Sequence, residues 1–437
     1  MTTGTCTIHR AEIWTTSRFR AHQTNPEDSF ECFAAGALIV DEQGIIADVG
    51  DFAILKAQYT GAKVVDHPDS VIIPGFVDSH LHFPQLDMIG SHGKGLLDWL
   101  DHYTFPEEEK FASSAHAQQV ARRLCQELKA NGVTTAVMYS SAHHGATDAL
   151  FAEAAKSGLR AIIGKVAMDR HCPASMQQPL ESQIAHNEEL MAKWHRSTPL
   201  LHYAITPRFA PACSPALLRA LGDLKAAHPD VYVQSHHAET PEEVALVGSL
   251  FPEQKDYLSV YEDFGLLGAK TLLGHGIYTT KKERDILAET KTKIIHCPTS
   301  NLFLGSGLMH FESLRHAGVT VALGSDIGAG TSLSPFRTMT AAYKVQALHQ
   351  NPHIPLHPVE LLRLATLDGA DALGLGHETG SLTKGKSADF VVLKPHRNRL
   401  LSERFKRESD PLIRLFATII HGDDRLVDSA YVRGKCL

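Results

Sequence analysis

The sequence predicts an α/β fold, namely a TIM-like (β/α)8 barrel with a small β-sandwich domain built from both ends of the chain. Between residues 71 and 326, short runs of β-branched and apolar residues alternate with helix-length segments. This alternation is typical of a parallel sheet, and about eight such units over roughly 300 residues favour a closed barrel over an open sheet. The flanking segments carry strand-like runs separated by glycine turns, which predict the small domain.

The barrel strands are predicted at residues 71–82, 133–139, 160–166, 201–208, 231–236, 271–277, 293–298 and 319–326. Three helices are predicted to begin where a capping side chain precedes proline, at Ser214-Pro215, Thr240-Pro241 and Ser334-Pro335. Thr280 and Glu283 have the spacing of a capping box. The run of glutamates and one lysine at residues 107–110 predicts a solvated helix face.

The chain is long enough for one large and one small domain. Residues 70–376 are predicted to form the barrel, and residues 1–69 and 377–437 to form the two parts of the small β domain. Strand-like segments at 36–40 and 388–393 lie beside glycine-bearing turns at 41–44 and 384–386. Because the two end segments have the same character, we expect them to fold together.

Composition argues against several classes of protein. The 437 residues carry a formal net charge of -7 and no lysine- and arginine-rich run, so no nucleic-acid surface is expected. No apolar segment approaches the roughly 18–20 residues that cross a bilayer, and residues 1–6 lack the pattern of a signal peptide. The 7 cysteines are scattered without a C-x-x-C pair. They indicate neither a disulfide framework nor a cysteine zinc site, and a reducing cytoplasm fits best.

Polar residues stand at the ends of the predicted strands, where a barrel of this kind places its site. His80 and His82 end the first strand and project to the same face, because side chains alternate along a strand. The fifth strand ends in adjacent histidines at 236 and 237, the sixth in His275 and the eighth in Asp326. Each could be a loop or cap residue alone, but barrel closure places the eighth strand beside the first. Three histidines and one aspartate then suit Zn²⁺ or Fe²⁺ with a position left for water.

A carboxylate follows the fifth strand. Glu239 lies just before the helix cap at Thr240, where it suits a proton shuttle, although a carboxylate there also interacts favourably with the helix dipole. The fourth strand ends in Thr206-Pro207-Arg208 without a lysine to bridge two metals as a carbamate, so one metal per chain is expected. Because Lys165 lies near the end of the third strand, a two-metal site remains an alternative. No P-C-x-x-C, H-E-x-x-H or P-loop motif is present.

The chain resembles the amidohydrolase superfamily in its opening barrel strand, residues 71–82, and in residues 365–370 and 380–390. Shorter segments are similar to the guanine deaminase family within it: residues 82–85, 97–100, 103–106, 205–211, 297–302 and 325–331. The resemblance spans nearly the whole chain. One departure is His237-Ala238, where the family has an apolar residue followed by serine.

The resemblance implies roles for individual residues. The metal ligands would be His80, His82, His236 and Asp326, with His236 preferred over its neighbour. The purine would be held by Gln85, Arg208 and Phe209, with contacts from His82, His236, Glu239 and Asp326. The catalytic residues would be Glu239, His275 and Asp326. In this scheme Asp326 takes a proton from the attacking water, which His275 orients, and Glu239 protonates a ring nitrogen.

The resemblance further implies metal-dependent deamination of guanine to xanthine and ammonia, in a cytoplasmic enzyme of purine metabolism. One divalent metal, Zn²⁺ or alternatively Fe²⁺, is expected per chain. The partner would be a small purine base rather than nucleic acid or membrane, and we expect a homodimer. Alternatives remain open: action on 8-oxoguanine, another aminopurine or a triazine, a two-metal cyclic-amide hydrolase, or a scaffold without catalysis.

Overall fold

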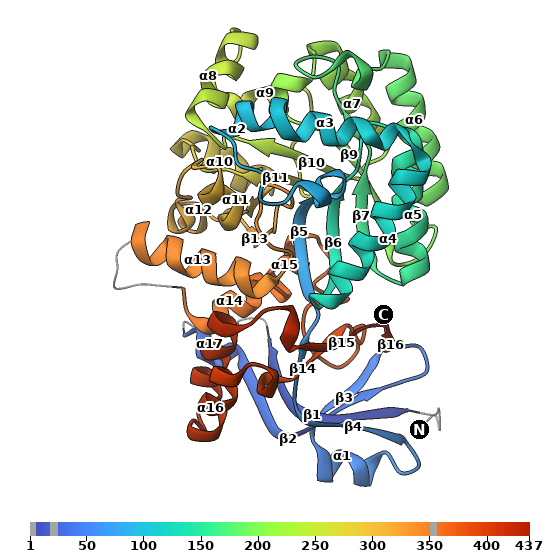
Figure 1. Cartoon of the computed structure of the whole chain (residues 1–437), viewed down its shortest axis with the longest axis vertical. Helices are drawn as coiled ribbons and strands as arrows, with labels where there is room; N and C mark the ends of the chain where they lie inside the picture. The colour runs from blue at the N-terminus through green and yellow to red at the C-terminus, as the bar shows by residue number, and fades with distance from the viewer. Residues whose placement is uncertain (1–5, 18–24, 350–355) are drawn as a thin grey trace.

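The parallel barrel predicted from the sequence is present in the computed structural model, which describes residues 6–17, 25–349 and 356–437 (Figure 1). Its strands, in their order around the barrel, are β5 (Phe76–His82), β6 (Val133–Tyr139), β7 (Arg160–Gly164), β9 (Leu201–Pro207), β10 (Tyr232–His237), β11 (Thr271–His275), β12 (Lys293–His296) and β13 (Val321–Leu323). The short β8 (Val166–Ala167) pairs with β9. The sequence prediction that residues 1–6 are not a signal peptide concerns a segment of which residues 1–5 lie outside the described residues.

The barrel closes through backbone hydrogen bonds beyond the end of β13. The N–H of Asp326 donates to the carbonyl of His80 at 2.8 Å, and the N–H of His82 donates to the carbonyl of Ile327 at 2.6 Å. Inside, each strand contributes an apolar residue to one buried layer: Val77, Val137, Ile162, Ala204, Tyr232, Leu272, Ile295 and Ala322. The closing bonds therefore join the loop of Asp326 to the strand that carries the histidine pair.

The first predicted strand, residues 71–82, is in fact two strands that meet at Gly75. β4 (Lys63–Pro74) belongs to the small sheet, and β5 begins the barrel. A side chain at position 75 would lie 2.1 Å from Thr134 Oγ1, so only glycine fits where the chain passes between the sheets. The predicted eighth strand is also shorter than expected. A Cβ at Gly324 would lie 2.7 Å from that of His80, and the extended pairing ends at Leu323.

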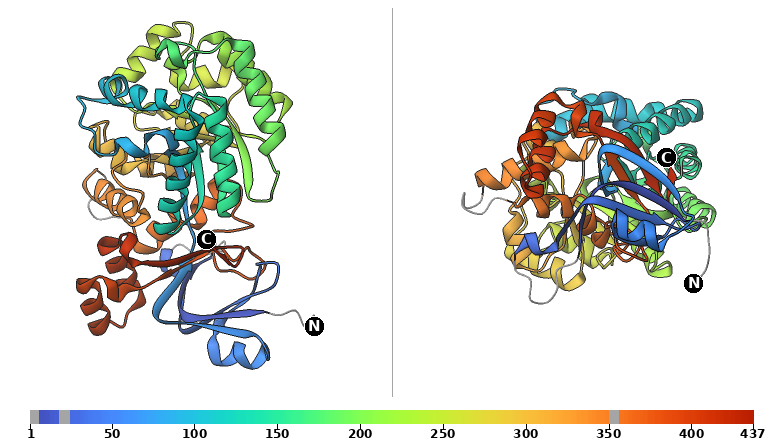
Figure 2. Two further views of the ribbon diagram at one scale, coloured as in Figure 1. Left: turned by 45° about the vertical axis from the view of Figure 1, so that its right-hand side comes forward. Right: turned by 90° about the horizontal axis from the view of Figure 1, so that it is seen from below.

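The small β domain built from both termini is confirmed: its strands follow one hydrogen-bonded order, and Val40 and Ile46 near one end pack with Phe390 and Val392 toward the other (Figure 2). The strand order is β16 (Lys435–Cys436), β15 (Val427–Val432), β14 (Phe390–Leu393), β4, β1 (Thr7–Thr16), β2 (Phe30–Val40) and β3 (Ile46–Asp51). β4 pairs in parallel with β1 and antiparallel with β14. Because β4 is paired along both edges, the N-terminal and C-terminal strands become parts of the same sheet.

Helices surround the barrel and flank the small sheet (Figure 1). The capping box at Thr280 and Glu283 is confirmed, as are the caps in which Ser214 and Thr240 accept backbone N–H groups. The helices are α1 (Phe52–Gln58), α4 (Ser114–Ala130), α5 (His144–Ser157), α6 (Leu180–Trp194), α7 (Pro215–Ala227), α8 (Pro241–Leu250), α9 (Tyr257–Asp263), α10 (Lys281–Thr290), α11 (Pro298–Phe303), α12 (Phe311–His316), α13 (Pro335–His349), α14 (Pro358–Leu364), α15 (Leu367–Ala372), α16 (Arg399–Arg407) and α17 (Pro411–His421). Among the described residues, none of the helices is both long and apolar enough to span a membrane.

A further helical segment crosses the end of the barrel at which the strands finish (Figure 1). It consists of α2 (Leu96–Trp99), the π-helical turn η3 (Leu100–Thr104) and α3 (Phe105–Glu109). The expectation that residues 107–110 form a solvated face is wrong for Glu108, which is buried, although Glu109 and Lys110 are exposed. The reason is periodicity, because Glu108 shares one helix face with the buried residues Thr104, Phe105 and Phe111.

Candidate active site

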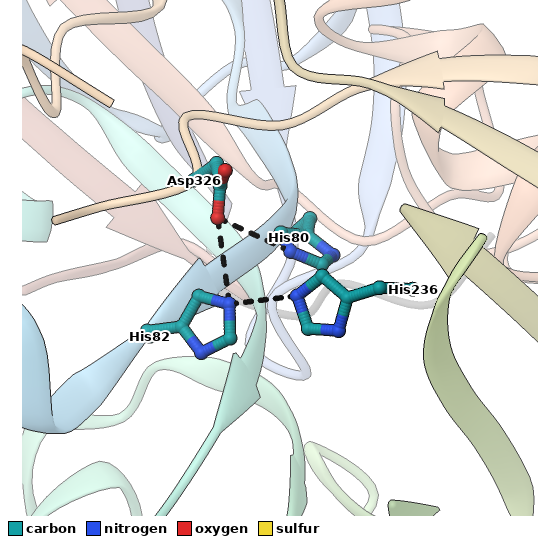
Figure 3. Close-up of side chains that lie close together, drawn as sticks. All are labelled: His80, His82, His236 and Asp326. Carbon is teal, nitrogen blue, oxygen red and sulfur yellow. Dashed lines mark hydrogen bonds and ion pairs between the residues drawn. The ribbon is translucent and has the colours of Figure 1, made fainter. Parts of the chain in front are cut away.

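The structure brings His80, His82, His236 and Asp326 together at the carboxyl end of the barrel (Figure 3). One donor atom from each residue lies within 4.8 Å of the other three. The Nε2 atoms of His82 and His236 are 3.0 Å apart, and Asp326 Oδ1 lies 3.3 Å from His80 Nε2 and 3.4 Å from His82 Nε2. Four donors from β5, β10 and the loop after β13 thus converge on one point.

The donor set fits a divalent metal ion. Burial lowers the pKa of His80, of His82 and of His236, so their imidazoles are neutral and offer lone pairs. Burial alone would raise the pKa of Asp326, but the close approach of His80, with His275 and His82 nearby, holds that pKa below its usual range. Within the described part of the chain, His80 Nε2 has no hydrogen-bond partner. Ligand atoms about 2.1 Å from a tetrahedral ion lie about 3.4 Å apart, close to the separations observed.

The adjacent histidines of β10 point in opposite directions. His236 Nδ1 donates to the carbonyl oxygen of Arg208 at 2.5 Å, which leaves the lone pair of Nε2 facing the cluster. His237 turns away from it, with its ring against Tyr257 and its Nε2 3.7 Å from Glu283 Oε1. Strand alternation produces this difference, and it puts His236 rather than His237 in the cluster.

Glu239 and His275 lie next to the cluster. Glu239 Oε2 is 3.4 Å from His275 Nε2, and Glu239 Oε1 accepts a hydrogen bond from Ser306 Oγ at 2.7 Å. Burial raises the pKa of Glu239 to about 7, with the nearby His275 opposing the rise. His275 Nδ1 donates to Asn301 Oδ1 at 2.9 Å, and its Nε2 lies 3.8 Å from Asp326 Oδ2. A carboxyl group that titrates near neutral pH can both accept and release a proton.

A pocket opens beside these residues. Its polar lining includes Gln85, Arg208 and Glu239 together with the cluster residues His82, His236 and Asp326. Its apolar lining consists of Leu96, Trp99, Leu100, Phe209, Leu304 and Ala329. The sequence-predicted residues of the purine site therefore share one pocket with the cluster, and the segment from α2 to η3 forms part of its wall.

Sequence reasoning missed Glu108, a buried carboxylate behind the pocket wall that contacts two of the lining residues. Its carboxylate accepts hydrogen bonds from Arg208 Nη1 at 2.6 Å, from Arg208 Nη2 at 3.0 Å and from Gln85 Nε2 at 2.9 Å. The other end of the Gln85 amide accepts from the N–H of Gly328 at 3.1 Å. The spacing of Thr104, Glu108 and Phe111 on one helix face was the signal that could have identified it.

Three further supporting residues were also missed: Asp78, Asn301 and Ser306. Asp78 Oδ1 accepts from the N–H groups of Ser325 at 2.9 Å and His80 at 3.3 Å, so it ties the loop before Asp326 to β5. Burial raises the pKa of Asp78 to about 6, although these hydrogen bonds oppose the rise. Asp78 and Asn301 lie in segments that resemble the family, but the sequence does not reveal their supporting roles, because these depend on partners such as Ser325 and His275 that lie on other strands or loops.

Comparisons with known proteins agree with this architecture. The model of the amidohydrolase family matches residues 71–436. The guanine deaminase of Escherichia coli is 39% identical to this chain, over 94% of this chain and 93% of that protein. A structure of guanine deaminase from C. acetobutylicum with bound guanine superposes with a TM-score of 0.90 at 32% identity, and covers 99% of this chain and 100% of that chain. A zinc-bound adenosine deaminase structure from Xanthomonas campestris gives a TM-score of 0.85 at 26% identity, over 98% of this chain and 92% of that one. Fold, cluster and similarity along nearly the full length lead to one conclusion: the chain belongs to the amidohydrolase family.

Proposed function

We propose that this protein is a guanine deaminase, which hydrolyses guanine to xanthine and ammonia with one divalent metal ion. The observation that carries the proposal is the single pocket in which Arg208, Gln85 and Phe209 lie beside Glu239 and the His/Asp cluster. The similarity to guanine deaminases over nearly the whole chain supports the same substrate. Substrate-reading groups and proton-moving groups are thus placed within reach of one small planar molecule.

We assign the metal to His80, His82, His236 and Asp326. When bound, a divalent cation in such a site activates water for attack at neutral pH. Zinc is proposed because neutral imidazoles and one carboxylate suit it, and the similar adenosine deaminase of Xanthomonas campestris has bound zinc. Iron(II) is the second candidate for the same donor set.

The remaining residues orient the base and move protons. Phe209 offers its ring face to the purine, and Arg208 and Gln85 offer N–H donors to its oxygen and nitrogen edge. Because Ser306 holds Glu239 Oε1, the proton is carried on Oε2, 3.4 Å from His275 Nε2. In the reaction, the water gives one proton to Asp326 as its oxygen bonds to C2, and Glu239 delivers a proton to the adjacent ring nitrogen. The remaining hydroxyl proton then returns to Glu239, the proton held by Asp326 passes to the amino group, and the C2–amino bond breaks to leave a C2 carbonyl and ammonia.

The assay that tests this proposal measures ammonia release from a panel of guanine, 8-oxoguanine, adenine and a triazine. We expect guanine to give the highest kcat/KM of the panel. A higher kcat/KM for 8-oxoguanine or a triazine would reassign the substrate within the same reaction type. Activity on cyclic amides without ammonia release would contradict deamination itself.

Metal content separates the one-metal and two-metal alternatives. We expect about one zinc or iron per active chain, because the four donors fill one site. His275, Cys297 and Asp326 form a neighbouring group, but burial raises the pKa of the Cys297 thiol well above its usual value and keeps it protonated. Elemental analysis of the purified enzyme, with activity lost to a chelator and restored by zinc, checks the expectation. Two metals per active chain would contradict it.

A further inference from the structure

Glu108 links the wall of the pocket to the two polar side chains proposed to read the purine. It lies on α3, in the same helical segment as the wall residues Trp99 and Leu100. Its carboxylate holds both Nη atoms of Arg208 and the Nε2 of Gln85 at 2.6–3.0 Å. All three side chains are buried, with Glu108 1% and Arg208 3% exposed. A buried ion pair held by two parallel hydrogen bonds is directional, because the guanidinium and carboxylate are both planar.

We propose that Glu108 is a positioning residue for purine recognition, which fixes Arg208 and Gln85 so that their remaining N–H groups face the base. This inference rests on the proposed deamination of guanine. Glu108 does not line the pocket with these two residues, so it acts through them rather than on the substrate.

A count of donors shows what Glu108 determines. A guanidinium has five N–H groups, and the carboxylate takes one from Nη1 and one from Nη2. About three N–H groups remain along the flanks of Arg208 for the base. A carboxylate only accepts, so it also fixes which end of the Gln85 amide is nitrogen. The amide oxygen then points to the N–H of Gly328, which lies close to Asp326 in the chain.

Without the carboxylate, Arg208 becomes a buried cation beside the ring of Phe105, whose centre lies 5.3 Å from the guanidinium carbon. An unpaired buried charge is costly, so the guanidinium is expected to turn toward water or toward other acceptors. Glutamine at position 108 keeps the size of the side chain, but its NH2 group would face a donor of Arg208 or Gln85. The N–H groups of Arg208 and Gln85 would then no longer be oriented toward the base.

The neighbouring glutamates provide matched controls. Glu107 pairs with Lys110 at 2.6 Å, and the exposed Glu109 accepts a hydrogen bond from Ser175 Oγ. Neither is part of the Arg208 and Gln85 network. Glu109→Gln makes the same chemical change as Glu108→Gln on the same short helix, so it reports the effect of charge loss without loss of positioning.

The experiment is a double-mutant cycle on the full-length, metal-loaded protein, with kcat and KM for guanine measured for each variant. Glu108→Gln is expected to lower kcat/KM about 100-fold, mostly through KM, and Glu108→Asp to recover part of the loss. Combined with Arg208→Ala, it is expected to add less than about threefold to the loss caused by Arg208→Ala alone, because it acts through that residue. Glu109→Gln is expected to stay within about twofold of the wild type.

The outcomes separate the two proposals. A wild type that releases no ammonia from guanine overturns the proposed function and this inference with it. The inference alone is overturned if the wild type is active and Glu108→Gln has the same kcat/KM as the wild type. It is also overturned if the losses in kcat/KM caused by Glu108→Gln and Arg208→Ala multiply in the double variant. If Glu108→Gln does not fold, as judged by metal content and circular dichroism, the same cycle with Glu108→Asp decides the question.

Discussion

Glu239→Gln is expected to lower kcat for guanine by about 10²–10⁴, while metal content stays at the wild-type level. Glutamine preserves the shape of the side chain and can still accept from Ser306 Oγ, but it cannot carry a proton from water to the purine. In the native protein burial raises the pKa of Glu239 to about 7, so its carboxyl group exchanges protons readily near neutral pH. Steady-state ammonia release and elemental analysis on the same preparation measure both quantities.

Glu242→Gln is the matched control for this prediction. Glu242 lies in the first turn of α8, three residues along the chain, and it is exposed. Its replacement removes an acid near the same helix start without touching the pocket, so activity is expected to remain near the wild-type value. If Glu239→Gln retained near-normal turnover, the proton would have to be moved by another group, with His275 the nearest candidate.

Arg208 is expected to decide substrate choice. Its N–H groups suit the carbonyl oxygen at C6 of guanine, whereas adenine presents an amino group there and would place a donor against a donor. Because a site that loses such hydrogen bonds keeps its own polar groups unpaired, discrimination of about 10⁴ or more in kcat/KM is expected for guanine over adenine. Arg208→Ala is expected to lower kcat/KM for guanine about 100-fold or more.

Arg208→Lys tests whether the shape of the guanidinium matters in addition to its charge. Lysine keeps the charge but lacks the planar fork that meets both oxygens of Glu108, so only partial recovery is expected. Ammonia release from guanine and adenine by the wild type and both variants measures the effect. Comparable kcat/KM values for the two bases, or an Arg208→Ala variant as active as the wild type, would mean that other residues read the purine.

Local signals in the sequence were sufficient to predict the barrel. Strands and helix starts are encoded within a few residues, as the capping box at Thr280 and Glu283 illustrates. The cluster could also be anticipated, because side chains at the ends of parallel strands converge wherever the barrel closes. The choice between His236 and His237 depended on which face of β10 is interior. The structure settles this, because Tyr232 belongs to the buried layer inside the barrel, and His236, four residues further along the strand, faces the same side.

Features that depend on distant partners could not be predicted. Residues 71–82 look like one strand because apolar residues continue on both sides of Pro74-Gly75, although this is a breaker pair within the run. The break exists because Pro74 pairs with Phe390, whereas Phe76 pairs with Val133. Glu108 was misjudged for a similar reason. An acidic run usually faces water, and the arginine that makes burial favourable lies 100 residues further along the chain.

The central place of β4 in the small sheet bears on the order in which the molecule is completed during synthesis. The strand continues through Gly75 into β5, so it anchors the segment that carries His80 and His82. A ribosome makes these histidines early, but β4 lacks one neighbour until residues 390–393 of β14 have emerged. A chain that stopped before residue 390 would contain every residue of the His/Asp cluster and still leave an open strand edge, which favours aggregation. Protection of the β4 edge, next to the strand that carries the histidine pair, therefore depends on residues that are translated long after those histidines.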